Sequence, residues 1–284
     1  HACTYFMKHG KFPKTLKKEV LEAVKILENK FNKKFNDNKN PMLLSVRSGA
    51  QTSMPGMMET VLNIGLNNKT IIGLINQTNN NRFVYDSYRR LLTMYADVVM
   101  EKSNNFNFNV RHQLELELEK VKKRKNILHD SGLSEKDLVK LCQLYENKII
   151  AILGQKFPQD SEEQLWKSIE AVFKSWNGSR AKKYRRIEKI PDSWGTAVNV
   201  QCMVFGNMGN TSATGVAFTR NPATGENMFF GEWLPNAQGE DVVAGIRTPF
   251  QITGKKNSLE ILMPEIYKQL FQIQKKLEKH YKDM

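Results

Sequence analysis

The sequence has few cysteines and no apolar run long enough to cross a membrane. Its three cysteines, Cys3, Cys142 and Cys202, lie far apart in 284 residues and form no C-x-x-C pair. This spacing argues against a disulfide framework and favours a reduced compartment. A membrane helix needs about 20 consecutive apolar residues, and the N-terminus lacks the pattern of a signal peptide. We therefore expect a cytoplasmic protein that does not contact a membrane.

The sequence also lacks metal-ligand and phosphate-loop motifs. Its five histidines show no metal-ligand spacing, so we expect no metal site in this chain; they are His1, His9, His112, His129 and His280. The P-loop pattern G-x-x-x-x-G-K-[ST] does not occur either. These absences disfavour a zinc enzyme and a P-loop nucleotide-binding protein.

Acidic residues are too few to balance the basic ones. There are 43 lysines and arginines against 29 aspartates and glutamates, which gives a net charge of +14. A basic protein favours anionic partners such as nucleotides, nucleic acid or acidic proteins. The lysines are spread widely, and the aromatic residues fall on apolar helix faces, so we expect no nucleic-acid partner. A basic nucleic-acid-binding module without catalytic activity is the alternative, and a salt-dependent gel shift with random DNA would support it.

The most informative stretch is PMLLSVRSGAQTSMPGMMETVLNIGL, residues 41–66. An apolar run at 42–46 predicts a buried strand, which delivers Arg47 to a loop rich in glycine and hydroxyl residues before a second strand at 61–66. Glycine lets backbone N–H groups approach an anion, hydroxyls add donors, and arginine forks onto phosphate oxygens. The pattern is consistent with a polyphosphate site, and equally with a hairpin-like loop that carries a surface arginine.

Periodicity along the rest of the chain predicts separate helices and strands. Helices are expected at 2–8, 16–30, 82–101, 112–126, 134–153, 161–176, 179–188 and from 263 to the end, with residues 68–160 mostly helical. Further strands are expected at 196–205, 213–219 and 228–234, with a fourth strand or loop around Val242, Val243 and Ile246. This combination predicts an α+β protein of two lobes.

Several polar residues are assigned structural roles. Arg89 and Arg90 fall on a helix and are interpreted as a solvated or ion-paired face. The run 122–125, KKRK, is interpreted as the solvated end of a helix, favoured by the helix dipole. Ser134 followed by Asp137 resembles a capping box. Cys142 and Cys202 are expected to be core residues rather than reactive thiols.

Five segments, in order, carry a resemblance to a known family. They are SVRSGAQTSMPGMMETVLNIGLN, RFVYDSYRRLLTMYADVVM, FKSWNGSRAKKYRR, WGTAVNVQCMVFGNMGNTSATGVAFTRNPATGE and NAQGEDVVAGIRTP. Together they resemble the nucleotide-binding domain of the pyruvate, phosphate dikinases, which are relatives of phosphoenolpyruvate synthase. The resemblance covers nearly the whole chain.

The resemblance implies an ATP-grasp-like fold of two lobes with a nucleotide between them. Residues 1–67 would form the first part of one lobe with the phosphate loop, and 68–160 a helical insertion. Residues 161–205 would return to the first lobe and contribute the interlobe strand, and 206–284 would belong to the second lobe.

The resemblance also implies roles for residues that bind the ATP phosphates. Arg47 would grip the phosphates and, as the catalytic residue of this chain, stabilise charge on the transferring group. Ser53, Gly56 and Thr60 would belong to a mobile loop over the phosphates, whereas the methionines of that loop are expected to pack within it.

On the nucleoside side, Gln201 would bond the exocyclic amine of adenine. The backbone of Met203 or Val204 would read the ring edge, and Glu240 would lie near the ribose or the adenine pocket. For Gln201 an ordinary strand-edge residue is the alternative, and for Glu240 a solvated loop residue.

The family's reaction interconverts ATP, phosphate and pyruvate with AMP, pyrophosphate and phosphoenolpyruvate through a phosphohistidine on another domain. The resemblance therefore implies ATP and Mg²⁺ as cofactors, with the Mg²⁺ ligands outside this chain, and a homodimer for the full-length enzyme. We expect the 284-residue chain alone to be inactive and to bind ATP weakly. A phosphoenolpyruvate synthase, which uses water instead of phosphate, and a regulatory nucleotide-binding module remain alternatives.

Overall fold

The computed structural model describes residues 1–243, 245, 247–254 and 256–282, apart from the side chains of Glu240 and Val243. The chain divides into two compact units, which meet in sequence between Met203 and Val204. The helices of 68–160 belong to the first unit together with its sheet. Among the described helices, none is both long and apolar enough to span a membrane.

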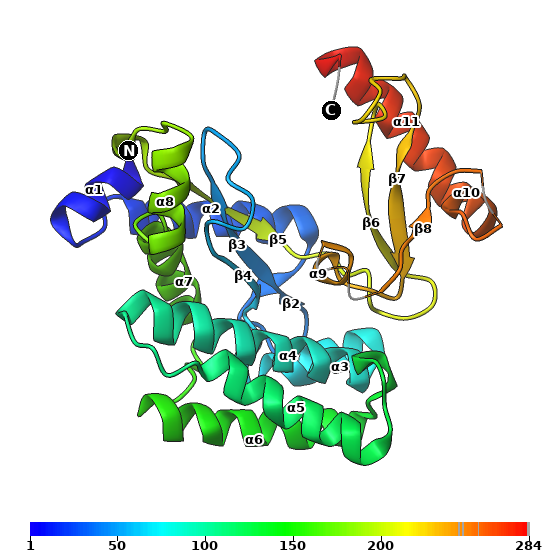
Figure 1. Ribbon diagram of the computed structural model, residues 1–284. Helices are drawn as coiled ribbons and strands as arrows, with labels where there is room; N and C mark the ends of the chain where they lie inside the picture. The colour runs from blue at the N-terminus through cyan, green and yellow to red at the C-terminus, as the bar shows by residue number, and fades with distance from the viewer. Residues whose placement is uncertain (244, 246, 255, 283–284) are drawn as a thin grey trace. The chain divides into compact units, whose positions relative to one another are not determined.

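The first unit is built on a three-stranded antiparallel sheet (Figure 1). Strand β3 (Leu44–Gly49) lies in the centre, between β4 (Thr60–Ile64) and β5 (Ala197–Cys202). A separate parallel pair is formed by β1 (Lys34–Phe35) and β2 (Pro41–Met42). The expected strands are confirmed with shifted ends, and β3 continues to Gly49. The sequence had suggested that Arg47 follows the strand, but Arg47 lies within it.

Eight α-helices complete the first unit. They are α1 (Ala2–His9), α2 (Leu16–Phe31), α3 (Thr70–Thr78), α4 (Asn81–Tyr95), α5 (Val110–Lys125), α6 (Glu135–Leu153), α7 (Ser161–Ser175) and α8 (Ser179–Ile187). Helix α4 continues into a π-helical turn, η1 (Ala96–Glu101), and short 3₁₀ turns are η2 (Lys102–Asn104), η3 (Asp130–Gly132) and η4 (Asp192–Trp194). The predicted capping box is confirmed, because the Asp137 N–H donates to Ser134 Oγ and the Ser134 N–H to the Asp137 carboxylate.

The core of the first unit lies between the sheet and the helices. Val46, Val61 and Ile64 of the sheet are fully buried, as are Leu91 and Tyr95 of α4. Helix α4 contacts β4, and α7 contacts both β3 and β4. Burying a large apolar side chain contributes about 1.5–3 kcal/mol, so this layer supports the sheet from one side.

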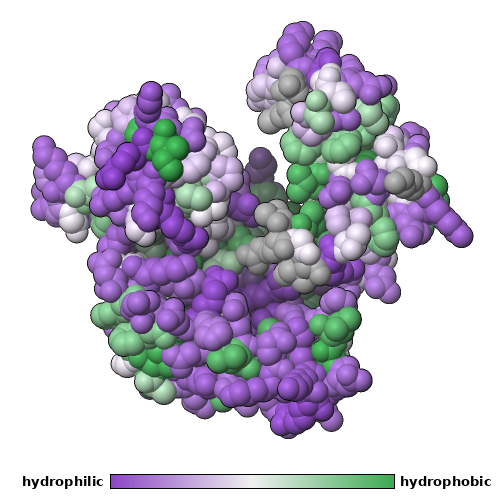
Figure 2. All heavy atoms as spheres, viewed as in Figure 1, coloured by the Kyte–Doolittle hydropathy of each residue, from purple (hydrophilic) through white to green (hydrophobic). Residues whose placement is uncertain are grey.

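Helices α4, α5 and α6 run side by side (Figure 1), and α6 contacts both of the others. The face shown in Figure 2 is mostly hydrophilic over these three helices, with separate hydrophobic patches. Within the 122–125 run, Lys123 and Arg124 are exposed, as predicted. The prediction is wrong for Lys122, whose side chain is 14% exposed and pairs with Glu119 and Asp130.

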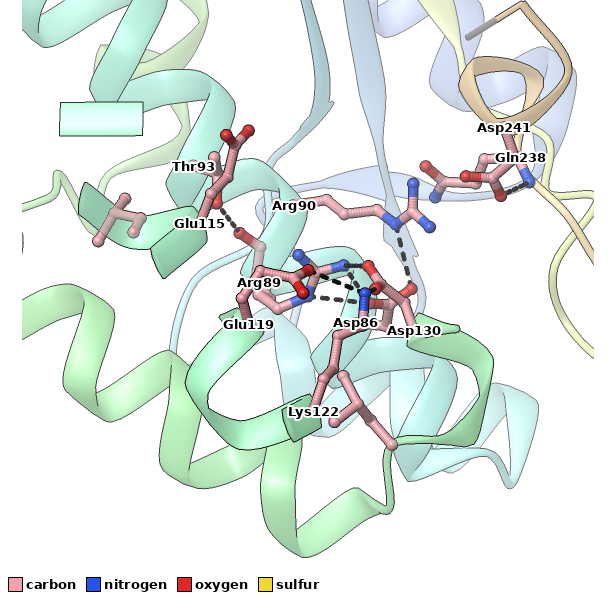
Figure 3. Close-up of polar contacts among 12 residues, drawn as sticks. Asp86, Arg89, Arg90, Thr93, Glu115, Glu119, Lys122, Asp130, Gln238 and Asp241 are labelled. Carbon is pink, nitrogen blue, oxygen red and sulfur yellow. Dashed lines mark hydrogen bonds and ion pairs between the residues drawn. The ribbon is translucent and has the colours of Figure 1, made fainter. Parts of the chain in front are cut away.

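A buried ion cluster joins this helical layer (Figure 3). Arg89 donates to Asp86 at 2.7 Å and to Asp130 at 3.1 Å, while Arg90 donates to Asp86 at 3.1 Å. The side chains of Asp86 and Arg89 are both 6% exposed. Of the two roles expected for Arg89 and Arg90, the ion-paired one is confirmed. Removing one partner of such a pair is costly, because the other charge then stays buried and uncompensated.

The second unit contains another antiparallel sheet. It consists of β6 (Ala213–Phe218), β7 (Phe230–Pro235) and β8 (Phe250–Gln251), in that order. Its helices are α9 (Gly239–Val243), α10 (Leu259–Leu262) and α11 (Pro264–Tyr281). Trp233 forms the core with Phe229, Ile252 and Leu259, against which Tyr267 and Phe271 of α11 pack. The two antiparallel sheets and their helices confirm the α+β class.

One expectation for the second unit is wrong. Val242 and Val243 lie in helix α9 and not in a fourth strand, and Ile246 lies outside the described residues. The physical reason is local, because the Asp241 carboxylate turns back to accept the Gln238 N–H at 2.9 Å. A carboxylate in this position satisfies a free donor at a helix start. The strand that completes the sheet is β8.

The ion cluster predicts a specific acid sensitivity. Burial by itself raises the pKa of Asp86, but the charges of Arg89 and Arg90 outweigh it and lower this pKa to about 2. The pKa of an aspartate in an unfolded chain is about 3.9. The contribution of Asp86 to stability is therefore complete above about pH 4 and is lost as the pH falls through about 2. Linkage puts this contribution on the order of 2 kcal/mol.

We expect Asp86→Asn to lower the free energy of unfolding at pH 7. Between pH 5 and pH 2 the free energy of unfolding of this variant should also fall less steeply, because the contribution that titrates with Asp86 is missing. Urea unfolding followed by far-UV circular dichroism at several pH values measures both effects. Glu188→Gln is the control, because Glu188 is exposed and its carboxylate has no hydrogen bond or ion pair among the described residues. An unchanged acid slope in Asp86→Asn would contradict the assignment.

Candidate functional site

Three of the predicted site residues share one face of the first unit's sheet. Arg47 on β3 lies opposite Thr60 on β4 and opposite Asn199 on β5, and Ser45 lies opposite Gln201. Directly opposed residues of an antiparallel pair lie on the same face, as do residues two positions apart along a strand. The register therefore places Arg47, Thr60, Asn199 and Gln201 together on the face that does not carry Val46.

Arg47 is exposed, and its guanidinium has no ion pair or hydrogen bond within the part of the chain that the structure describes. Arg89 and Arg185, in contrast, are buried and paired with aspartates. A guanidinium carries five N–H donors in a fixed fork. Arg47 is thus held on a central strand with its donors available to an anion.

The loop between β3 and β4 is fixed at its centre by Met54. This side chain is 6% exposed and packs against Trp176 and Ala181, with Met57 and Met58 partly buried beside it. The expectation that the loop methionines pack within the structure is confirmed. Trp176 is held in turn by Arg185, whose guanidinium lies 4.0 Å from the centre of the indole ring.

Of the three residues expected in the mobile loop, Thr60 lies instead at the start of β4 and is half-buried. Ser53 and Gly56 are exposed, and Gly56 has a φ of 70°, in the left-handed region that favours glycine. The Met57 N–H donates to the Met54 carbonyl at 3.1 Å and closes the turn. Ser53 and Gly56 therefore sit on an exposed turn whose base is anchored by Met54.

Glu59, just before Thr60, holds the far end of this loop. Its carboxylate lies 3.3 Å from both Lys102 and Arg180, and its N–H donates to Ser175 Oγ at 3.3 Å. These partners come from η2, α8 and α7. No local sequence signal connects residues so far apart, and this network was missed for that reason.

The chain leaves β5 through Met203 and Val204. The Met203 N–H donates to the Leu43 carbonyl at 2.8 Å, which extends the pairing of β5 with β3 one residue beyond the strand ends. A base contact from the Met203 backbone is consequently restricted to its carbonyl. Val204, the first residue of the second unit, is 84% exposed, and its backbone makes no hydrogen bond to any described residue. Gln201 is exposed.

Three further sequence assignments concern Glu240 and two cysteines. Glu240 belongs to α9, but its side chain lies outside the described part of the chain. Cys142 is buried, donates to the Tyr85 carbonyl at 3.4 Å, and has its pKa raised by burial. Its predicted core role is confirmed. Cys202 is only partly buried, and burial again raises its pKa, which keeps the thiol protonated at neutral pH.

No group of three or more potential ligands placed to hold a metal ion occurs among the described histidines, cysteines, aspartates and glutamates. An open groove of about 670 Å³ lies beside α1 and the start of α2, lined among others by Tyr5, His9 and Glu19. None of the predicted site residues lines this groove. The chemistry that the sheet face offers is therefore anion binding by Arg47, supplemented by hydroxyl and amide groups.

Comparison with known proteins gives a consistent family match. Residues 3–284 match the family described as "Pyruvate phosphate dikinase, AMP/ATP-binding domain". The chain is 48% identical over 286 residues to pyruvate, phosphate dikinase of Clostridium symbiosum and 49% identical over 284 residues to the chloroplastic one of Mesembryanthemum crystallinum. It is 49% identical over 292 residues to that of Rhizobium meliloti (strain 1021). All of this chain is covered, but only 31%, 29% and 32% of those relatives.

The anchoring role of Met54 predicts a local effect of its removal. Met54→Ala leaves a void against Trp176, and large-to-small core changes of this type cost roughly 2–5 kcal/mol. We expect faster amide hydrogen exchange in residues 51–59, with little change in α4–α6. Gln51→Ala, at an exposed position of the same loop, is the control. Equal exchange in Met54→Ala and the unmodified chain would show that Met54 does not hold the loop.

Proposed function

The chain belongs to the pyruvate phosphate dikinase AMP/ATP-binding domain family, and we propose that it binds ATP as a domain of ATP-grasp architecture. In this proposal the two compact units correspond to the two lobes of that fold. The observation that supports it best is the exposed guanidinium of Arg47, which is unpaired among the described residues and is flanked across the sheet by Thr60. A fixed fork of donors suits the oxygens of a polyphosphate.

Arg47 binds the phosphates and stabilises the charge that develops on the transferring group. Catalysis of phosphoryl transfer depends mainly on positioning and electrostatic stabilisation. The Thr60 hydroxyl and the loop residues Ser53 and Gly56 supply further donors, and Gly56 permits close backbone approach. Lysine does not reproduce the bidentate geometry of Arg47, because its ammonium acts as a point charge.

The segment from Gln201 to Val204 recognises adenine. Gln201 accepts a hydrogen bond from the exocyclic amine, and the backbone of Val204 or the carbonyl of Met203 reads the ring edge. Glu240 contributes on the ribose or adenine side. Edge hydrogen bonds of this kind orient a ligand within a mostly apolar site.

The activity of the whole protein follows from the relatives, of whose length this chain spans about three tenths. We propose that the domain serves a pyruvate, phosphate dikinase, which interconverts ATP, phosphate and pyruvate with AMP, pyrophosphate and phosphoenolpyruvate. A histidine on another domain of the same polypeptide accepts the group from ATP. Mg²⁺ bound by residues outside this chain neutralises phosphate charge. The full-length enzyme is a cytoplasmic homodimer in this proposal.

The role of Arg47 is tested by Arg47→Ala and Arg47→Lys in a full-length dikinase that carries residues 1–284 as its ATP-binding domain. We expect both variants to lose at least about 100-fold in kcat/KM for ATP, since removing one stabilising donor costs about 10²–10³-fold. Steady-state kinetics with ATP varied measures this loss.

Arg124→Ala is the matched control, because Arg124 is exposed and its guanidinium has no hydrogen bond or ion pair among the described residues. The proposal is wrong if Arg47→Ala behaves like Arg124→Ala. Full activity in Arg47→Lys would show that charge alone is enough and would refute the forked contact.

The role of Gln201 is tested by base preference in the same enzyme. We expect Gln201→Ala to weaken ATP binding by roughly 3–10-fold, the value of one neutral hydrogen bond, and to leave the weaker binding of GTP unchanged. Competition calorimetry with both nucleotides measures the preference, and Gln272→Ala, on the exposed surface of α11, is the control. An equal loss for ATP and GTP would refute adenine recognition by Gln201.

A further inference from the structure

Asn199 lies opposite Arg47 on the neighbouring strand β5. It is the register partner of Arg47 on β5, it is exposed, and its side-chain amide makes no hydrogen bond to any described residue. Opposed residues of an antiparallel pair have Cβ atoms about 4.5–5.5 Å apart. An uncharged group with two donors and one acceptor therefore stands on the same sheet face as the guanidinium, from the neighbouring strand.

The position of the Asn199 amide explains a glycine in β3. A Cβ placed on Gly49 would lie 2.6 Å from Asn199 Nδ2, so the amide occupies the space that a side chain at residue 49 would need. Gly49 is not among the residues with positive φ, so its backbone does not require glycine. The requirement is steric, because the Asn199 amide lies over Gly49, two residues along β3 from Arg47.

We propose that Asn199 is a further ligand-binding residue, whose amide donates to a phosphate oxygen of the nucleotide that Arg47 holds, and that Gly49 positions it. This inference rests on the proposed function, because it requires a polyphosphate at Arg47. An amide is suited to this position because it supplies a donor without adding charge, and buried or bound phosphate oxygens accept several donors at once.

A purely structural role does not account for the arrangement. The inward-facing neighbours Val198 and Val200 are partly buried, whereas Asn199 is exposed and its amide makes no hydrogen bond within the described part of the chain. An asparagine that stabilised the fold would donate to or accept from a described group, as Asn63 does when it donates to the Ser87 carbonyl at 3.1 Å.

The test uses a full-length dikinase that carries residues 1–284, with the variants Asn199→Ala, Gly49→Ala, their combination, and Asn199→Asp. Calorimetry measures binding of ATP and of adenosine, which lacks phosphates. We expect Asn199→Ala to raise the Kd for ATP about 5–10-fold and to leave adenosine binding unchanged. Asn199→Asp, nearly the same in shape but negatively charged, should weaken ATP binding by more than Asn199→Ala.

Gly49→Ala should reproduce the effect of Asn199→Ala, because the added methyl displaces the amide. Its thermal midpoint should change little, since the displaced atom is the end of a flexible side chain. The double variant should be no weaker than either single variant, because both changes remove the same contact. Asn76→Ala, which removes an exposed amide on α3, is the matched control and should bind ATP normally.

The outcomes separate this inference from the proposed function. If Arg47→Ala loses ATP binding and Asn199→Ala does not, the inference is wrong and the proposed function stands. If neither variant affects ATP, both are wrong. An equal loss of ATP and adenosine in Asn199→Ala overturns the phosphate contact, and additive losses for Gly49→Ala and Asn199→Ala overturn the positioning role of Gly49.

Discussion

The pairing of β3 with β5 is the constraint on which the candidate site depends. Six consecutive residue pairs, from Leu44 with Cys202 to Gly49 with Ala197, join two segments that are distant in the sequence. The Gly49 N–H adds a bond at 3.2 Å to Thr196 Oγ1, which is 147 positions away. A slip of one residue would turn every side chain to the opposite face. The buried valines of one face therefore determine which polar groups the other face presents.

Two kinds of interaction hold the helical layer: apolar packing and a buried ion cluster. Apolar side chains of α4, such as Leu91, are fully buried on the sheet side. The Arg89 guanidinium joins Asp86 of the same helix to Asp130 of η3, so that the 3₁₀ turn is fastened to α4. A buried ion pair adds less net stability than an equal apolar contact but strongly penalises the loss of either partner. An arrangement of α4 and η3 that separated these charges would be unfavourable, so the cluster favours the observed one.

The β3–β4 loop combines a fixed base with an exposed tip. Met54 packs against Trp176, and Glu59 is held by Lys102 and Arg180, whereas Ser53 and Gly56 face solvent. The anchors lie on both sides of Gly56, so the exposed turn is short and bounded by packed or ion-paired residues. In the proposed function, a loop anchored in this way would lose less entropy on binding an anion than a loop without anchors.

The sequence by itself determined the helices, most strands, the α+β class and the family, because periodicity, caps and motifs are local properties. It also predicted the strand at 196–205 that carries Asn199 and Gln201. It failed at Val242 and Val243, where the turned-back carboxylate of Asp241 starts a helix. Only the tertiary structure decided that Asn199 lies opposite Arg47 and that Asp130 reaches Arg89, because strand register and helix packing depend on contacts between distant segments.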